Sequence, residues 1–168
     1  MNLRGLICLN KRGNVWLAVA GLVISPNGEW LVVKKKYSGL KNQWSLPAGF
    51  VNGGETVDEA VLREVQEETG VSCVLKGLVG LRTGVINGET SGNMMIFMLE
   101  PIGVQKIIAQ ESELFEACFM DPLMLIEQPN VSVMLRYLLN QTESGVKLAI
   151  NGINPGNQFG YTAYKLFL

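Results

Sequence analysis

The stretch that decides the fold is GFVNGGETVDEAVLREVQEETGV, residues 49–71. It predicts a helix over residues 55–69. Thr56 followed by Glu59 forms a capping box, which specifies the N-terminus of a helix locally. Gly70 stands where helices commonly end, because glycine readily adopts the left-handed conformation of a C-terminal cap. The segment is therefore expected to form a loop, a helix and a second loop.

The side chains of this helix do not separate into an apolar and a charged face. At 100° per residue the apolar positions form one stripe. Its members are Val57, Ala60, Val61 and Val65. Glu64, Glu67 and Glu68 fall within or beside the same stripe. We therefore expect these carboxylates to point into a groove that continues the core surface, and not into open solvent.

Such an arrangement is unfavourable unless a positive charge compensates it. Glu64 and Glu68 are like charges at i,i+4, and they lie near the C-terminal end of the helix, where anions are disfavoured. A divalent cation is the simplest compensation. The chain has no histidine, so oxygen ligands and Mg²⁺ or Mn²⁺ are expected. Arg63 could orient one glutamate by a bidentate pair, or form an ordinary surface ion pair.

Composition narrows the class of protein. The chain has 168 residues, of which 48% are hydrophobic, and a net charge of -1. These values predict one domain, residues 1–168, with no duplex nucleic acid as partner. Three cysteines without a C-x-x-C pair indicate reduced thiols in a cytoplasmic protein. The apolar run at residues 15–24 is too short for a membrane span and is better explained as a buried strand than as a secretory signal.

Alternating apolar residues and turn signals predict the remaining elements. We expect strands at residues 18–25, 30–34, 71–82, 93–100, 117–120 and 161–168, a short extended stretch at 44–50, and helices from 121 and over 131–140. The result is a mixed α/β domain with helices packed on sheet. The tail, residues 145–168, is expected to form a hairpin or an exposed strand through which a homodimer could form.

Residues 49–71 resemble the signature of the Nudix hydrolase family, of which the MutT-like proteins are members. The family pattern is Gly, five residues, Glu, seven residues, Arg-Glu, an aliphatic residue, any residue, Glu-Glu, any residue, Gly and an aliphatic residue. The matching positions are Gly49, Glu55, Arg63, Glu64, Val65, Glu67, Glu68, Gly70 and Val71. The pattern is long and chemically specific, so agreement by chance is improbable.

The resemblance implies an α/β/α sandwich with a mixed β-sheet, in which the box is a catalytic loop–helix–loop. It also implies hydrolysis of a nucleoside diphosphate linked to another group, with Mg²⁺ or Mn²⁺ as cofactor. The implied metal ligands are the carboxylates of Glu64, Glu67 and Glu68 and the carbonyl of Gly49. Arg63 would orient Glu64, and Glu55 would brace the loop. An activated water would then attack phosphorus in line.

The general base and the substrate contacts are less well specified by the sequence. Glu64 or Glu67 could accept the proton, and so could Glu113 in a later acidic segment, for which a plain solvated loop acid is an equal alternative. Lys34 is a candidate phosphate contact within Lys34–Lys36, although a solvated strand end that protects a sheet edge is favoured. Arg82 could clamp a phosphate, and Phe50 is the best candidate for stacking on a base.

The substrate itself stays open. Nucleoside triphosphates, ADP-sugars and triphosphorylated RNA ends are all compatible with the box. The alternative function is a nucleotide-binding sensor that keeps the fold without turnover. A sensor predicts a damaged box, whereas this box is complete, so a small-molecule pyrophosphohydrolase is the favoured hypothesis.

Overall fold

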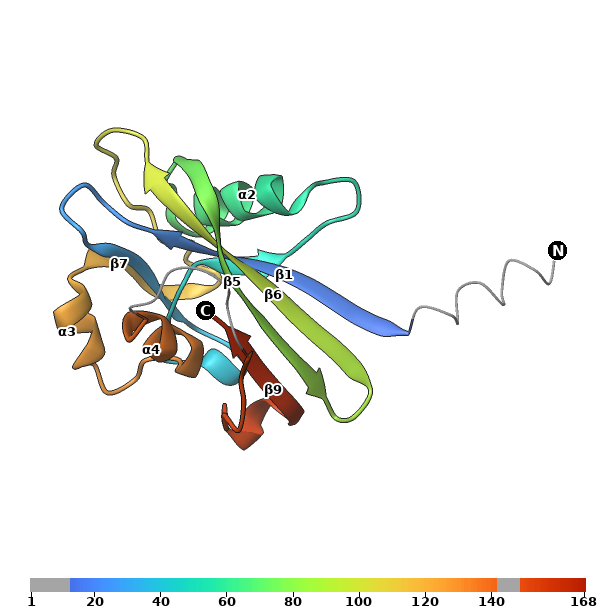
Figure 1. The fold of residues 1–168 in the computed structure, drawn as a ribbon. Helices are drawn as coiled ribbons and strands as arrows, with labels where there is room; N and C mark the ends of the chain where they lie inside the picture. Colours follow the sequence, from blue (N-terminus) through green and yellow to red (C-terminus); the bar gives the residue numbers. More distant parts are fainter. Residues whose placement is uncertain (1–12, 142–148) are drawn as a thin grey trace, which may run out of the picture.

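Two β-sheets form the frame of the molecule, for which a computed structural model describes residues 13–141 and 149–168 (Figure 1). The larger sheet has the order β4 (Ala48–Phe50), β1 (Asn14–Val23), β6 (Thr90–Pro101), β5 (Cys73–Ile86), β9 (Tyr161–Phe167) and β8 (Ala149–Ile150). The smaller sheet has the order β3 (Trp44–Ser45), β2 (Trp30–Lys35) and β7 (Leu114–Met120). Strands β1 and β6 are parallel and the other pairs are antiparallel, which confirms the expected mixed sheet.

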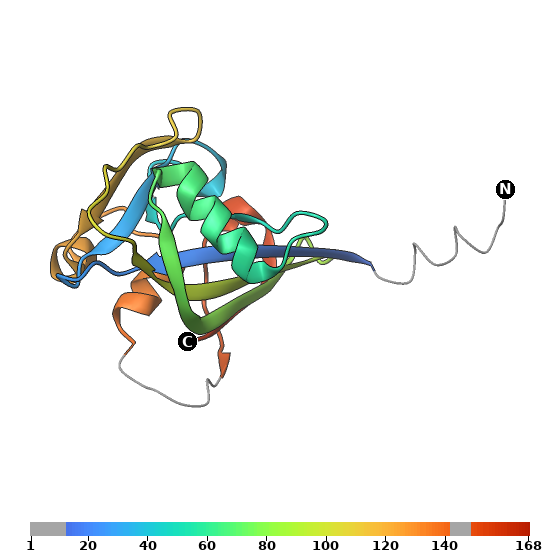
Figure 2. The ribbon, with the colours of Figure 1, turned by 90° about the horizontal axis from the view of Figure 1, so that it is seen from above.

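Helices lie on both sides of this frame. Helix α2 (Val57–Thr69) covers one face of the large sheet, and Figure 2 looks down on it. Helices α3 (Pro122–Ile126) and α4 (Val133–Leu139) lie on the opposite side. The described residues also include two short 3-10 helices, η1 (Ser38–Leu40) and η2 (Asn157–Phe159). The α/β/α layering expected from the sequence is therefore confirmed.

The apolar stripe of α2 packs directly on β1 and β6. Ala60, Val61 and Val65 are fully buried in one core cluster with residues of both strands. The approach is close at Gly21, where a Cβ atom would lie 2.6 Å from a methyl carbon of Val65. A side chain at position 21 would push the helix away from the sheet, so this glycine sets the height at which α2 lies.

A second core lies under α4. Leu135 and Leu138 pack there with Leu46 and Ile96. Leu166 of β9 is fully buried in the same cluster. The C-terminal strand therefore contributes to the core, because β9 adds to the edge of β5 and turns Leu166 inward.

Two elements differ from their predicted bounds for identifiable reasons. Strands β5 and β6 continue into a hairpin whose turn contains Asn87 and Gly88, both with positive φ. Antiparallel pairing therefore persists to the turn, past the predicted end at residue 82. Helix α4 begins later than predicted, because the Ser132 side chain caps it by accepting a hydrogen bond from the Leu135 N–H.

The tail forms an antiparallel pair, β8 with β9, although residues 145–148 of the predicted tail lie outside the described ranges. Within residues 13–141 and 149–168, no helix combines the length and apolar content needed to cross a membrane. Cys73 and Cys118 are free and partly buried. Burial raises the pKa of the Cys73 thiol to about 11, so this thiol is protonated at neutral pH. The third cysteine, Cys8, lies outside the described residues.

Candidate active site

Arg63 joins the loop before α2 to the helix itself. Its guanidinium makes a two-pronged pair with Glu55, with distances of 3.0 Å from Nε to Oε2 and 2.6 Å from Nη2 to Oε1. Nη2 also donates to the Phe50 carbonyl at 3.0 Å. The pairing with Arg63 lowers the pKa of Glu55 to about 2. This pairing fixes the loop to the helix.

The same guanidinium gathers two of the predicted metal-binding carboxylates. Nη1 of Arg63 donates to Glu64 at 2.7 Å and to Glu67 at 3.1 Å. The Glu64 side chain is only 14% exposed, whereas that of Glu67 is 52% exposed. One nitrogen therefore holds both carboxylates, with Glu64 turned inward and Glu67 at the margin of the buried stripe.

Gly49 makes room for the Glu64 carboxylate. A Cβ atom at this position would lie 2.2 Å from the Glu64 carboxyl carbon. Only a residue without a side chain leaves the Glu64 carboxylate in this position. The structure therefore places the Gly49 backbone against Glu64, two groups that the sequence suggested as ligands of one cation.

Glu68 is buried and paired with Lys35. Its side chain is 2% exposed, and one carboxylate oxygen accepts a hydrogen bond from the Lys35 ammonium. The other oxygen accepts from the Ala48 N–H at 3.3 Å. Burial raises the pKa of Glu68, and the neighbouring Lys35 opposes that rise. The compensating charge expected from a metal ion is supplied here by a lysine of β2.

Oxygen donors of this type suit a hard divalent cation. In this structure the carboxylates are instead held by the side chains of Arg63 and Lys35. Glu64, Glu113 and Gly49 line the cavity, and the sequence has no imidazole group. Across the described ranges, no three acidic or thiol side chains converge on a single point. Arg63 binds Glu64 and Glu67, whereas Glu68 pairs with Lys35.

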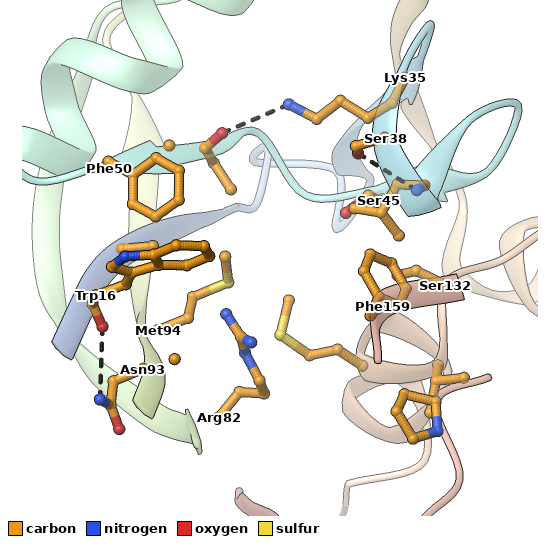
Figure 3. Close-up of a pocket in the computed structure, with 18 of the residues that line it drawn as sticks. Trp16, Lys35, Ser38, Ser45, Phe50, Arg82, Asn93, Met94, Ser132 and Phe159 are labelled. Carbon is orange, nitrogen blue, oxygen red and sulfur yellow. Dashed lines mark hydrogen bonds between the residues drawn. The ribbon is translucent and has the colours of Figure 1, made fainter. Parts of the chain in front are cut away.

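One continuous cavity of about 590 Å³ extends from the helix to the C-terminal segment (Figure 3). Gly49 and Glu64 line its acidic end. Its other end is rich in aromatic and apolar side chains. These are Trp16, Phe50, Met94, Met134, Phe159, Tyr161 and Tyr164. The cavity therefore combines a charged end with an apolar end, as ligand pockets commonly do.

Three further predicted residues line this cavity, namely Phe50, Arg82 and Glu113. Glu113 accepts a hydrogen bond from the Tyr37 hydroxyl. The pKa of Tyr37 is raised, first by burial and then by that carboxylate, so Tyr37 stays protonated and donates. Glu113 and Glu64 line the same cavity, although they lie far apart in the sequence.

Lys34 lies apart from this group. Its ammonium lies 5.5 Å from the centroid of the Trp44 ring, and it does not line the cavity. Lys35 lines it instead, because successive side chains of a strand point to opposite faces. The expectation that these lysines protect a sheet edge was wrong, since β2 is paired on both sides, with β3 and with β7. Strand alternation was the signal that could have singled out Lys35.

The fold and the site together are those of an α/β domain with a carboxylate-rich helix beside a ligand cavity. Comparison of the sequence with known families identifies which family of such domains this is. The model of the NUDIX domain family matches residues 15–140. The chain belongs to this family. The match ends before β8, η2 and β9, which therefore lie outside the matched residues.

Relatives support the assignment. Nudix hydrolase 8 of Arabidopsis thaliana is 31% identical over 144 residues, 83% of this chain and 39% of that protein. An ADP-ribose pyrophosphatase of Methanocaldococcus jannaschii is 36% identical over 105 residues, 60% of this chain and 61% of that protein. The chain spans about half the length of the curated relatives it matches. The crystal structure of a MutT protein from Methanosarcina mazei shares the fold, with a TM-score of 0.64, 23% identity, and coverage of 76% of this chain and 92% of that one.

Proposed function

We propose that this protein hydrolyses the pyrophosphate bond of a nucleoside diphosphate linked to another group. The observation that carries the proposal is that Glu64, Gly49 and Glu113 face one cavity. Arg63 holds Glu64 at its acidic end. A pyrophosphate beside these carboxylates, with the rest of the substrate in the apolar end, would fit the polarity of the whole cavity.

Mg²⁺ or Mn²⁺ is the cofactor that suits these donors. Nudix hydrolases generally need divalent cations, and the residues that would hold one are Glu64, Glu67, Glu68 and the Gly49 carbonyl. Glu68 would have to exchange Lys35 for the cation. A bound divalent cation would neutralise phosphate charge and make a coordinated water more acidic.

The protein's own groups would position the substrate and move the proton. Glu64 is the best candidate for general base, because it lines the cavity and Arg63 fixes its orientation. Glu113 is the second candidate, held by the Tyr37 hydroxyl. Arg82 also lines the cavity, and its guanidinium would meet a distal phosphate or a sugar.

A small nucleotide is the proposed substrate, and the relatives suggest which to test first. An ADP-ribose pyrophosphatase is among the proteins similar to this chain. ADP-ribose therefore heads a panel that also contains nucleoside triphosphates, dinucleotides and 5′-triphosphate RNA. A homodimer in the cytoplasm is the proposed setting, and light scattering of the purified chain tests the dimer.

The deciding experiment is release of nucleotide products from that panel with Mg²⁺ and with Mn²⁺. Glu64→Gln should abolish turnover, whereas Glu113→Gln should lower it less if Glu64 is the base. Glu89→Gln is the matched control, because Glu89 is an exposed carboxylate in the β5–β6 hairpin turn. Binding of nucleotides without cleavage of any of them would indicate the sensor function instead.

A further inference from the structure

The aromatic end of the cavity is built by two separate parts of the chain. Trp16 and Phe50 form one side, with their ring centroids 6.0 Å apart in an edge-to-face arrangement. Phe159 lies on the opposite side, with Arg82 between them (Figure 3). Trp16 is 49% exposed and Phe50 is 59% exposed. Large aromatic surfaces thus remain uncovered at the cavity, where a planar ligand would cover them.

The opposite side belongs to the C-terminal segment, residues 149–168. Strand β9 pairs with β5. Phe159 of η2 lies against η1, the 3-10 helix that follows β2. The Phe159 ring lies against Gly39, where a Cβ atom would be 2.3 Å from a ring carbon. The segment therefore closes one side of the cavity by joining the edge of the large sheet to the loop after β2.

The same segment fixes Arg82. The Tyr161 hydroxyl accepts a hydrogen bond from the Arg82 guanidinium, which also lies 5.7 Å from the centroid of the Tyr161 ring. Tyr161 in turn contacts Phe159 and Tyr164, with centroid distances of 5.9 Å and 5.1 Å. The three rings form a continuous aromatic surface, and each lines the cavity.

Two polar side chains of the cavity lining, Asn93 and Ser132, are engaged by the protein itself. The Asn93 carbonyl oxygen accepts from Thr83 at 2.6 Å, and its amide donates to Ser91 at 3.1 Å. Ser132 caps α4. The exposed aromatic faces are therefore a main surface that the cavity offers a ligand. Stacking on aromatic rings accepts any base, because every base has a π-face.

We infer that residues 149–168 form a specificity wall, in which Phe159 and Tyr161 hold the nucleobase of the substrate opposite Trp16 and Phe50. The inference rests on the proposed function for the nature of the ligand. The wall would favour ligands that carry a base over those that carry only sugar and phosphate, and it would accept purine and pyrimidine alike. The wall lies outside residues 15–140, so it is a feature of this chain and not of the region matched by the family.

Calorimetric titration of the metal-free protein with AMP, CMP and ribose 5-phosphate tests the wall directly. AMP and CMP should bind about 5- to 150-fold more tightly than ribose 5-phosphate, the factor expected for one stacked base. Phe159→Ala and Tyr161→Ala should reduce that factor toward one. Lys165→Ala is the matched control, because Lys165 is an exposed residue of β9 that does not line the cavity.

Trp16→Leu removes an aromatic ring from the opposite side of the cavity. It should reduce the preference for AMP and CMP in the same way, and it replaces a C-terminal variant that does not fold. Equal binding of AMP and ribose 5-phosphate, no binding of any of the three, or an unchanged preference in these variants would overturn the inference. If nucleotides bind through their base but none is cleaved, the result supports the specificity wall and contradicts the proposed function. Cleavage that ignores the base would sink the wall alone.

Discussion

At the scale of single residues, the ion pair between Lys35 and Glu68 is the most unusual feature of the molecule. Both side chains are almost fully buried, at 8% and 2% exposed. A buried pair of this kind contributes little compared with apolar residues of the same size, but loss of one partner leaves a charge without compensation. The pair therefore makes the two residues depend on each other.

We expect Lys35→Met to lower the free energy of unfolding by about 3 kcal/mol, because Glu68 would be left buried and unpaired. The double variant with Glu68→Gln should recover most of that loss. Urea unfolding measures both. Lys76→Met is the control, since Lys76 and Glu100 form an exposed pair on the surface, and its removal should change little. An equal loss in single and double variants would show that the pairing does not matter.

Gly49→Ala provides a second test at this scale. The added methyl would displace the Glu64 carboxylate, which lies within 2.3 Å of the position of the new Cβ. We expect turnover to fall about 100-fold, the size of effect produced by a displacement of about 1 Å in a catalytic group, while the melting temperature changes little. Gly53→Ala is the control, because its Cβ would meet nothing within 4 Å. Full activity in Gly49→Ala would argue against a role for Glu64.

At the scale of elements, helix α2 was predictable to a large extent and its partners were not. The spacing of Val61, Val65 and Glu68 placed all three on one stripe, and all three are buried. The periodicity of apolar residues predicts which face of a helix is buried, but not which residues of other elements pack against that face. Lys35 lies 33 residues from Glu68 in the sequence, so the compensating charge emerges only when β2 and α2 are packed together.

The loop before α2 should show a defined response to pH. Arg63 lowers the pKa of Glu55 from an ordinary 4.5 to about 2. A lowered pKa in the folded state stabilises the fold at all pH values above the ordinary one, and that contribution is lost as pH falls from about 4.5 toward about 2. Glu55→Gln should therefore lower the melting temperature at pH 7, and the difference from the wild type should shrink across that window.

Thermal unfolding at a series of pH values checks this expectation. Glu89→Gln is again the control, because it removes an exposed carboxylate of the β5–β6 hairpin turn. A difference between Glu55→Gln and wild type that stays constant from pH 7 to pH 2 would mean that the pairing with Arg63 does not stabilise the loop.

At the scale of the whole molecule, the C-terminal strand is part of the fold and not an appendage. Turn signals and apolar alternation predicted a strand near residue 161, but nothing local indicated its neighbour. Strand β9 pairs with β5, and Leu166 enters the core under α4. Pairing between strands so far apart in the sequence depends on the packing of the complete sheet, which a single sequence does not report.

We expect Leu166→Ala to lower the free energy of unfolding by about 2 to 5 kcal/mol, because it leaves a cavity in a fully buried position. Denaturant unfolding measures the loss, with Lys165→Ala as the neutral neighbour on the same strand. Wild-type stability in Leu166→Ala would mean that β9 is only loosely attached, which would also weaken the case for a wall built from this segment.

The Arg63 network has a consequence for how the molecule moves. The Asn52 N–H donates to Glu55 at 2.7 Å, and Arg63 ties Glu55 to α2. An exposed loop amide would ordinarily exchange with solvent deuterium within the shortest labelling time, but this one is fastened to a helix. Slow exchange at Asn52, at a rate shared with the amides of α2, would show that loop and helix open together as one cooperative unit.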